Sequence, residues 1–140
     1  MDQYVRDLMT PNPSAVTSGA TVIEAAKIMR ENDIGDVVVL EDNRLCGILT
    51  DRDIVVRGLA RGADPATTKV GDICSRDLTT VAPTTSVAQA IQVMRSKAIR
   101  RLPVVEEGGR IVGIVSIGDL AVERDRRSAL GEISAAPPNV

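Results

Sequence analysis

Apolar residues recur in the first half of the chain at helical spacing and then in short unbroken runs. The helical stripe consists of Val22, Ala25, Ala26 and Met29. Positions i, i+3, i+4 and i+7 predict an amphipathic helix, and Thr21 is of a type favoured at its N-cap. The runs VVVL at 37–40 and LCGIL at 45–49 follow, separated by a polar turn. Short β-branched runs on either side of such a turn predict a β-hairpin.

The second half shows the same order of patterns. Its helical stripe consists of Val87, Ala90, Ile91 and Met94, preceded by Ser86. The runs LPVV at 102–105 and IVGIV at 111–115 predict a second hairpin. Each hairpin leads into a further helix, near Asp51 and near Ile117. Each first helix follows a short extended segment, AVT at 15–17 or TVA at 80–82. The predicted unit is β-α-β-β-α, present twice.

A direct alignment of the halves confirms an internal repeat. Residues 5–42 align with 70–107 without a gap. The identical pairs include Val5/Val70, Asp7/Asp72, Val16/Val81, Val22/Val87, Ala25/Ala90, Met29/Met94, Arg30/Arg95 and Val39/Val104. One residue is then inserted at the turn, and Arg44/Arg110, Gly47/Gly113, Ile48/Ile114 and Asp53/Asp119 match beyond it. Because so small a unit cannot bury its own sheet, we expect the two repeats to pack together.

The repeats set the predicted domain organisation. We expect a first repeat at 1–61, a linker at 62–69, a second repeat at 70–125 and a tail at 126–140. Gly62 and the Asp64-Pro65 pair are typical of a linker. The end of the tail, SAAPPNV, is expected to fray.

Composition excludes several classes of function. Hydrophobic residues make up 44%, but Tyr4 is the single aromatic residue, and the net charge is −2. Without a basic stripe or stacking aromatics, a general nucleic-acid binder is not expected. The chain has no apolar run of membrane-spanning length, and MDQYVRDLMT does not have the pattern of a signal peptide. We therefore expect a cytoplasmic protein without a membrane partner.

The few cysteines and the absence of histidine limit the chemistry. Cys46 and Cys74 have neither CxxC spacing nor a histidine to join them, so no metal site is predicted and free apolar thiols are favoured. The lack of histidine removes Ser-His and Cys-His catalytic pairs. Catalysis by paired carboxylates remains possible, but no specific feature of the sequence indicates it. We therefore expect a protein that is not an enzyme and requires no cofactor.

One motif occurs in both repeats, GILTDRD at 47–53 and GIVSIGD at 113–119. A hydroxyl residue followed three positions later by a carboxylate is the pattern of a helix capping box, and spacing alone favours that interpretation. Alternatively, the two oxygens of each aspartate suit the vicinal hydroxyls of a ribose. The glycine inside each strand indicates either a bulge or the close approach of another backbone or of a ligand.

The repeat and this motif together resemble a CBS pair, also called a Bateman module. Supporting stretches are DLMTPNP, IRRLPVVEEGGRIVGIVSIGDL and DRDIVVRGLARGADPATT, and the resemblance spans about residues 4 to 125. It is strongest to small stand-alone bacterial CBS-pair proteins of the hypoxic-response type. It implies an α/β (α+β) fold in which two β-α-β-β-α repeats are related by a pseudo-two-fold and their sheets pack face to face. It also implies regulation by adenosine compounds (AMP, ADP, ATP or S-adenosylmethionine) bound in clefts between the repeats.

The resemblance also implies two candidate ligand sites. The preferred one is made of Ser116, Asp119, Arg100, Arg101 and Ile114, with Thr10, Ala15 and Ile34 from repeat one. The second is made of Thr50, Asp53, Arg52 and Ile48, with Ser75, Thr80 and Ile99 from around and within repeat two. Arginine is suited to phosphate, whereas Gly35-Asp36 stands where the other repeat has Arg100-Arg101, so the two sites are expected to be unequal.

The family further implies a homodimer through the helices that follow Asp53 and Asp119. The apolar residues available for it are Ile54, Val55, Leu59, Leu120 and Val122. Because no catalytic domain is attached, a regulated protein partner is expected. The alternative is a structural or interaction protein whose clefts bind no nucleotide.

Overall fold

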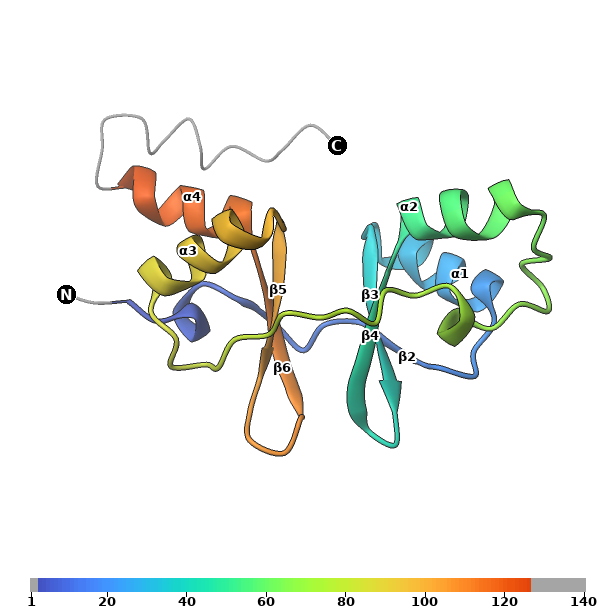
Figure 1. Cartoon of the computed structure of the whole chain (residues 1–140), viewed down its shortest axis with the longest axis horizontal. Helices are drawn as coiled ribbons and strands as arrows, with labels where there is room; N and C mark the ends of the chain where they lie inside the picture. The colour runs from blue at the N-terminus through green and yellow to red at the C-terminus, as the bar shows by residue number, and fades with distance from the viewer. Residues whose placement is uncertain (1–2, 127–140) are drawn as a thin grey trace. The chain divides into compact units, whose positions relative to one another are not determined.

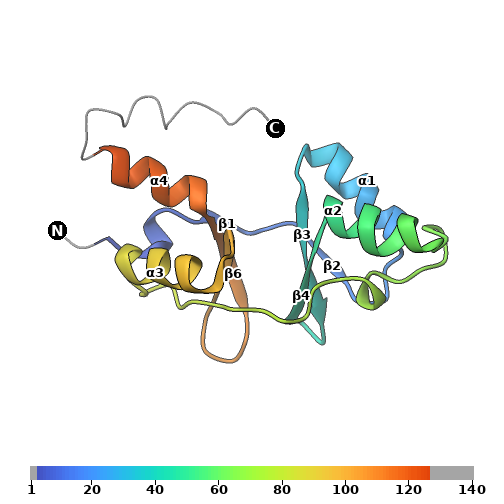
Figure 2. The same cartoon turned by 45° about the horizontal axis from the view of Figure 1, so that its top comes forward.

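The computed structural model describes residues 3–126, the last five by their backbone alone. The chain forms two compact units (Figure 1). Unit 1 comprises Met1–Asn12, Thr79–Glu106 and Ile111–Val140, and unit 2 comprises Pro13–Leu78 and Glu107–Arg110. Each unit has a sheet with helices on one face (Figures 1 and 2), and unit 2 has the β-α-β-β-α order that the patterns predict.

Unit 2 follows the predicted order of elements closely. Its elements are β2 (Ala15–Thr17), α1 (Val22–Asn32), β3 (Asp36–Glu41), β4 (Arg44–Thr50) and α2 (Asp51–Asp53). Helix α2 continues as a π-helical turn, η2 (Ile54–Gly58), and a 3₁₀ turn, η3 (Leu59–Arg61). The sheet has the order β2-β3-β4, in which β2 is parallel and β4 antiparallel to β3.

Unit 1 contains α3 (Val87–Lys97), β5 (Arg101–Val105), β6 (Ile111–Ser116) and α4 (Ile117–Arg126). Its sheet has the order β1-β6-β5, with β1 (Thr10–Pro11) antiparallel to β6. The predicted strand at 80–82 is reduced to one parallel bridge between Val81 and Val104. The chain turns there because the Thr85 hydroxyl accepts the N–H of Ala82 at 3.0 Å.

Both long helices begin where the pattern predicts. The hydroxyls of Thr21 and Ser86 accept the N–H groups of Glu24 and Gln89, whose side chains in turn accept the N–H of the cap residue. These capping boxes satisfy backbone donors that the first helical turn leaves without partners. The predicted stripes face the cores, since Val22, Ala25, Ala90 and Met94 are buried.

In each unit, the segment that begins one sequence repeat packs against the helix and hairpin of the other repeat. In unit 1, η1 (Val5–Asp7) buries Val5 completely, and the Val5 N–H donates to Thr85 O at 2.9 Å. In unit 2, η4 (Val70–Asp72) buries Val70, whose N–H donates to Ala20 O at 2.8 Å. The predicted ranges 1–61 and 70–125 therefore describe sequence repeats, whereas the compact units exchange their leading segments.

The predicted linker 62–69 is fastened to the start of α1. Pro65 O and Thr68 O accept the N–H groups of Ile23 and Val22, each at 2.9 Å. Asp64 Oδ1 accepts the N–H of Ala66 and closes the turn between them. The tail beyond residue 126, including SAAPPNV, lies outside the described residues.

Candidate functional site

The junction between β6 and α4 holds Ser116 and Asp119 in a reciprocal arrangement. The Ser116 N–H donates to Asp119 Oδ2 at 2.8 Å, and the Asp119 N–H donates to Ser116 Oγ at 3.1 Å. The capping-box interpretation is therefore confirmed here. It engages Oδ2 of the aspartate, and within the described residues Oδ1 has no hydrogen-bond partner.

The junction between β4 and α2 repeats this geometry. The N–H groups of Thr50 and Asp53 each donate to the other residue's side-chain oxygen at 3.0 Å. Here Asp53 Oδ1 also lies 3.8 Å from Nε of Arg57, one turn further along the helix. The two motifs are thus equivalent in backbone and cap, but the second carboxylate oxygen has a cationic neighbour only in unit 2.

Strand pairing brings the arginines of unit 1 to the same junction. Arg101 is opposite Ser116 in the β5–β6 ladder, and the Ile117 N–H donates to Arg100 O at 2.8 Å. Both arginines are exposed. Thr10 is opposite Ile114 in the β1–β6 ladder. Six of the eight residues predicted for the preferred site therefore lie around the end of β6.

The remaining two, Ala15 and Ile34, belong to unit 2, so their part in that site stays a prediction. The second predicted site divides in the same way. Ser75 bridges Ile48 within unit 2, beside the Thr50 junction, whereas Thr80 and Ile99 belong to unit 1.

In unit 2 an acid replaces Arg101, and a second acid lies beside the glycine that replaces Arg100. Asp36 is opposite Thr50, and the Asp51 N–H donates to Gly35 O at 2.9 Å. A Cβ on Gly35 would lie 3.3 Å from Asp51 Oδ2, so this carboxylate rests against the glycine that replaces Arg100. Sequence reasoning missed Asp51. The signal was present, because the repeat alignment sets Asp51 opposite Ile117.

The two junctions consequently differ in the sign of their charge. Around the Asp119 motif, Arg100 and Arg101 contribute +2 and Asp119 contributes −1, which gives +1. Around the Asp53 motif, Asp36, Asp51 and Asp53 contribute −3 and Arg52 and Arg57 contribute +2, which gives −1. Arg52 is exposed, and its backbone N–H donates to Asp51 Oδ1 at 2.8 Å. The charges of the unit 1 junction are therefore more favourable to an anion than those of the unit 2 junction.

The strand glycines confirm the predicted close approach. A Cβ on Gly47 would lie 2.7 Å from Cys74 Sγ and 2.9 Å from Ser75 O. A Cβ on Gly113 would meet the Met9 side chain and would lie 2.9 Å from Thr10 O. Only glycine, whose side chain is a single hydrogen atom, leaves room at these positions for the segments that carry Ser75 and Thr10 to lie against the strands.

Both cysteines are free thiols, as predicted. Burial raises the pKa of each thiol, and the Arg76 guanidinium partly opposes that shift. Cys74 belongs to the core of unit 2, and Cys46 packs against the same core.

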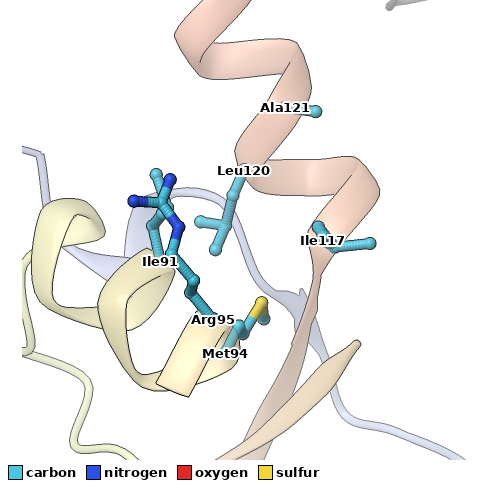
Figure 3. Close-up of a pocket in the computed structure, with 6 residues that line it drawn as sticks. All are labelled: Ile91, Met94, Arg95, Ile117, Leu120 and Ala121. Atoms are coloured by element: carbon cyan, nitrogen blue, oxygen red, sulfur yellow. The ribbon is translucent and has the colours of Figure 1, made fainter. Parts of the chain in front are cut away.

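The helices of unit 1 enclose a separate hollow between α3 and α4 (Figure 3). It has a volume of about 330 Å³ and is lined by Ile91, Met94, Arg95, Ile117, Leu120 and Ala121. The Leu120 side chain extends from α4 toward α3, and the Arg95 guanidinium lies beside Ile91 (Figure 3).

The residues predicted for a dimer contact differ in how far their side chains are exposed. Leu120 is 1% exposed and belongs to the core of unit 1, so it is not a surface residue, whereas Ile54 is partly exposed and packs against the core of unit 2. Val55 and Leu59 are 55% and 52% exposed, and Val56 is 46% exposed. The Val122 side chain lies outside the described residues.

Comparison with known proteins identifies relatives over most of the chain. Hypoxic response protein 1 of Mycobacterium tuberculosis is 41% identical over 117 residues, which cover 83% of this chain and 81% of the relative. A crystal structure of Hypoxic Response Protein I with two coordinated zinc ions matches with a TM-score of 0.76 and 40% identity, covering 85% of this chain and 97% of that one.

Two other solved structures are similar. The CBS domain pair of protein MJ0100, in complex with 5′-methylthioadenosine and S-adenosyl-L-methionine, matches with a TM-score of 0.80 and 26% identity. This match covers 91% of this chain and all of the other. A hexameric CBS-CP12 protein from bloom-forming cyanobacteria matches with a TM-score of 0.75 and 26% identity, covering 99% of this chain and 88% of that one.

The described residues do not fit a zinc ion. The chain has no histidine, and residues 3–121 contain no cluster of three or more His, Cys, Asp or Glu side chains placed to hold a metal. The charged neighbours of the two thiols are the Arg76 guanidinium, which is not a ligand, and one carboxylate each, Glu41 for Cys46 and Asp53 for Cys74.

No helix within residues 3–126 has the length and apolar character needed to cross a bilayer.

The family profile of the CBS domain matches this chain twice, at residues 5–59 and 70–125. The protein therefore belongs to the CBS-domain family and carries a CBS pair.

Proposed function

We propose that this CBS pair is a regulatory module that binds an adenine nucleotide (AMP, ADP or ATP) at the β6–α4 junction of unit 1 and performs no catalysis. The observation that carries this proposal is the pairing of Arg101 with Ser116 beside Asp119. A carboxylate, a hydroxyl and two guanidinium groups occur together there. Adenosine compounds are bound by the similar CBS pair of MJ0100.

The carboxylate of Asp119 is assigned to the ribose. Its Oδ2 is held by the Ser116 N–H, which fixes the side chain before any ligand arrives. Oδ1 remains for the ribose hydroxyls, which donate hydrogen bonds to it. Such preorganisation lowers the entropic cost of binding.

The phosphate is assigned to Arg100 and Arg101 at the start of β5. Guanidinium groups form charge-assisted, two-pronged hydrogen bonds with phosphate oxygens. The first N–H groups of α4 favour an anion at the same end of the junction. The N-terminus of the ten-residue helix α4 and both arginines therefore all favour a bound phosphate.

The adenine is assigned to aliphatic side chains, because Tyr4 is the only aromatic residue in the chain. Ile114 is the member of this set within unit 1, and Ala15 and Ile34 are predicted to complete it. Ligand sites are commonly apolar with a few placed polar groups, so such a surface is adequate.

The Asp53 junction is proposed as an unequal second site. Asp36 and Asp51 repel phosphate, so this junction takes either no ligand or an adenosine compound without phosphate, such as S-adenosylmethionine. Thr50, Ile48 and Ser75 lie together in unit 2, and Thr80 and Ile99 are predicted to complete the site.

The proposal is tested by calorimetric titration of nucleotide-free protein with AMP, ADP, ATP and S-adenosylmethionine. Asp119→Ala is expected to weaken nucleotide binding at least tenfold, because hydrogen bonds to charged groups contribute about 1.5–3 kcal/mol and 1.4 kcal/mol is a factor of ten. Asp53→Ala is the matched control, since it removes the same capping box. Equal binding by the parent and Asp119→Ala overturns the assignment.

A second candidate is supported by the capping boxes themselves. Both motifs are fully accounted for as helix caps, without a ligand. In this alternative the chain is a structural or interaction module that binds no nucleotide and acts through partner contacts. The absence of heat with all four ligands, from protein that is folded, favours it.

We further infer that the protein is a homodimer that also contacts a regulated protein partner. Val55, Val56 and Leu59 expose apolar surface along η2 and η3, and Ile117 is 53% exposed at the start of α4. Clustered apolar surface of this kind marks protein contacts in soluble proteins. Binding of a nucleotide regulates the partner only if it favours one of two packing states.

A further inference from the structure

The two cysteines of the chain lie close together in unit 2. Cys46 belongs to β4 and packs against the core of this unit, and Cys74, which follows η4, is part of that core. A Cβ on Gly47, the residue next to Cys46, would lie 2.7 Å from Cys74 Sγ and 3.4 Å from Cys74 Cβ. The Cys74 side chain therefore lies directly against the strand residue that follows Cys46.

A bulge in β4 turns Cys46 toward the face that Cys74 occupies. Leu45 and Gly47 are opposite consecutive residues of β3, so Cys46 between them is an extra residue without a partner in the ladder. Adjacent residues of a regular strand point to opposite faces, but a bulge re-aims the side chain of the extra residue. Cys46 accordingly packs against the core that contains Cys74.

The other repeat shows how these positions are filled without thiols. The repeat alignment sets Cys46 opposite Val112 and Cys74 opposite Met9. Val112 is likewise the extra residue of β6, the Met9 side chain lies against Gly113, and both pack against the core of unit 1. Apolar packing is therefore sufficient at this pair of positions. Unit 2 instead has a thiol at both of them, and the chain has no other cysteine.

Arg76 is held beside the thiol pair by contacts of its own. Its Nε and Nη2 donate to Gly71 O at 3.3 and 3.1 Å, and its Nη1 lies 3.8 Å from Glu41 Oε2. The guanidinium lowers the pKa of both thiols, so its charge reaches both sulfur atoms. A positive charge there stabilises a thiolate and opposes the binding of a metal cation between the sulfurs. The pair is thus better suited to oxidation than to metal binding.

The surroundings also determine which thiol reacts first. Burial raises the pKa of both thiols, Arg76 opposes that shift, and one carboxylate each, Glu41 for Cys46 and Asp53 for Cys74, adds to it. Because the thiolate is the nucleophile, both residues stay reduced and react slowly at neutral pH. Cys46 is half-buried and Cys74 is buried, so a small oxidant reaches Cys46 first.

We propose that Cys46 and Cys74 form a reversible disulfide when the protein is exposed to a peroxide, which is the oxidant for the reaction. The Cys46 thiolate attacks the peroxide, takes up one oxygen as a sulfenic acid and releases water or an alcohol. The Cys74 thiol then attacks that sulfur, so that the S–S bond forms, the S–O bond breaks and water leaves. The two thiols together lose two electrons and two protons, which the peroxide takes up.

The disulfide fastens the segment after η4 to β4. That segment carries Ser75, whose N–H donates to Ile48 O at 2.9 Å and whose carbonyl accepts the Ile48 N–H at 3.0 Å. Ile48 lies two residues before Thr50 on the same strand. Oxidation therefore stiffens unit 2 beside its own junction and leaves the covalent structure of unit 1 unchanged. This inference does not depend on the nucleotide proposed for unit 1.

Oxidation of the full chain with hydrogen peroxide tests the pairing. Protein is reduced, freed of reductant and treated with a small excess of peroxide, and remaining thiols are blocked with iodoacetamide before mass spectrometry. Because a disulfide requires Cα atoms within about 7 Å, its formation under native conditions reports the proximity of the two residues. We expect loss of two hydrogen atoms, a cross-link between Cys46 and Cys74 within one chain, and full reversal by dithiothreitol. Cys46→Ala should form no disulfide within the chain.

Cys46→Val combined with Cys74→Met is the matched control, because it gives unit 2 the side chains that unit 1 has at these positions. In the parent, oxidation should raise the urea midpoint of unfolding and the amide protection of residues 72–78, because a cross-link constrains the unfolded chain. In the control, peroxide should change neither. The proposal is overturned if the parent forms only disulfides between chains or only sulfinic acids. It is equally overturned if both thiols survive peroxide in the native protein but react in urea.

Discussion

At the scale of single residues, the two Ser/Thr-x-x-Asp motifs were predictable because their hydrogen bonds span three positions of the chain. Local spacing alone specifies a capping box, and both boxes form. The contact of Asp51 with Gly35 was not predictable in this way, because it joins residues sixteen positions apart through the fold. The charge difference between the junctions therefore emerged fully only from the structure.

The strand glycines give a prediction at this scale. Gly47→Ala should destabilise the protein by about 1–3 kcal/mol, because its Cβ would lie 2.7 Å from Cys74 Sγ and 2.9 Å from a backbone oxygen. Gly19→Ala is the control, since no atom lies within 4 Å of its added Cβ. Urea unfolding measures both. Equal midpoints for the two variants would show that the crossing segment gives way without cost.

At the scale of elements, helices and hairpins were predictable because periodicity is a local property of the sequence. The stripe of Val87, Ala90 and Met94 fixed α3, and the run IVGIV fixed β6. The strand expected at 80–82 failed because the Thr85 hydroxyl turns the chain at Ala82. Sequence analysis also missed the exchange of leading segments, because a hydrophobic pattern does not indicate which repeat a segment packs against.

The exchange of leading segments predicts which strands lose hydrogen-exchange protection when a residue of a leading segment is replaced. Val5→Ala should destabilise unit 1 by roughly 2 kcal/mol, because two buried carbons and their contacts are lost from its core. Hydrogen exchange should show the loss of protection in β5 and β6. Val70→Ala, the repeat equivalent, should expose β3 and β4 instead. If Val5→Ala weakened β3 and β4 most, each leading segment would belong to its own repeat.

At the scale of the whole molecule, the two repeats have kept one fold and diverged in their surfaces. The cores are built from equivalent positions, including the Val5/Val70 and Met29/Met94 pairs. The junction charges and the helical surfaces differ. A duplicated module whose halves differ in charge and in surface, and of which we propose that only one half binds an anion, is suited to regulation of a partner rather than to symmetric storage of a ligand.

The most direct test of the central claim locates the nucleotide on the unmodified protein. Backbone amide shifts are followed by NMR as AMP is added to nucleotide-free protein. The account predicts the largest shifts at Ser116–Leu120 and Arg100–Leu102, with smaller changes at Thr50–Ile54. Unchanged spectra at millimolar AMP, or shifts centred on Thr50–Ile54, would contradict it.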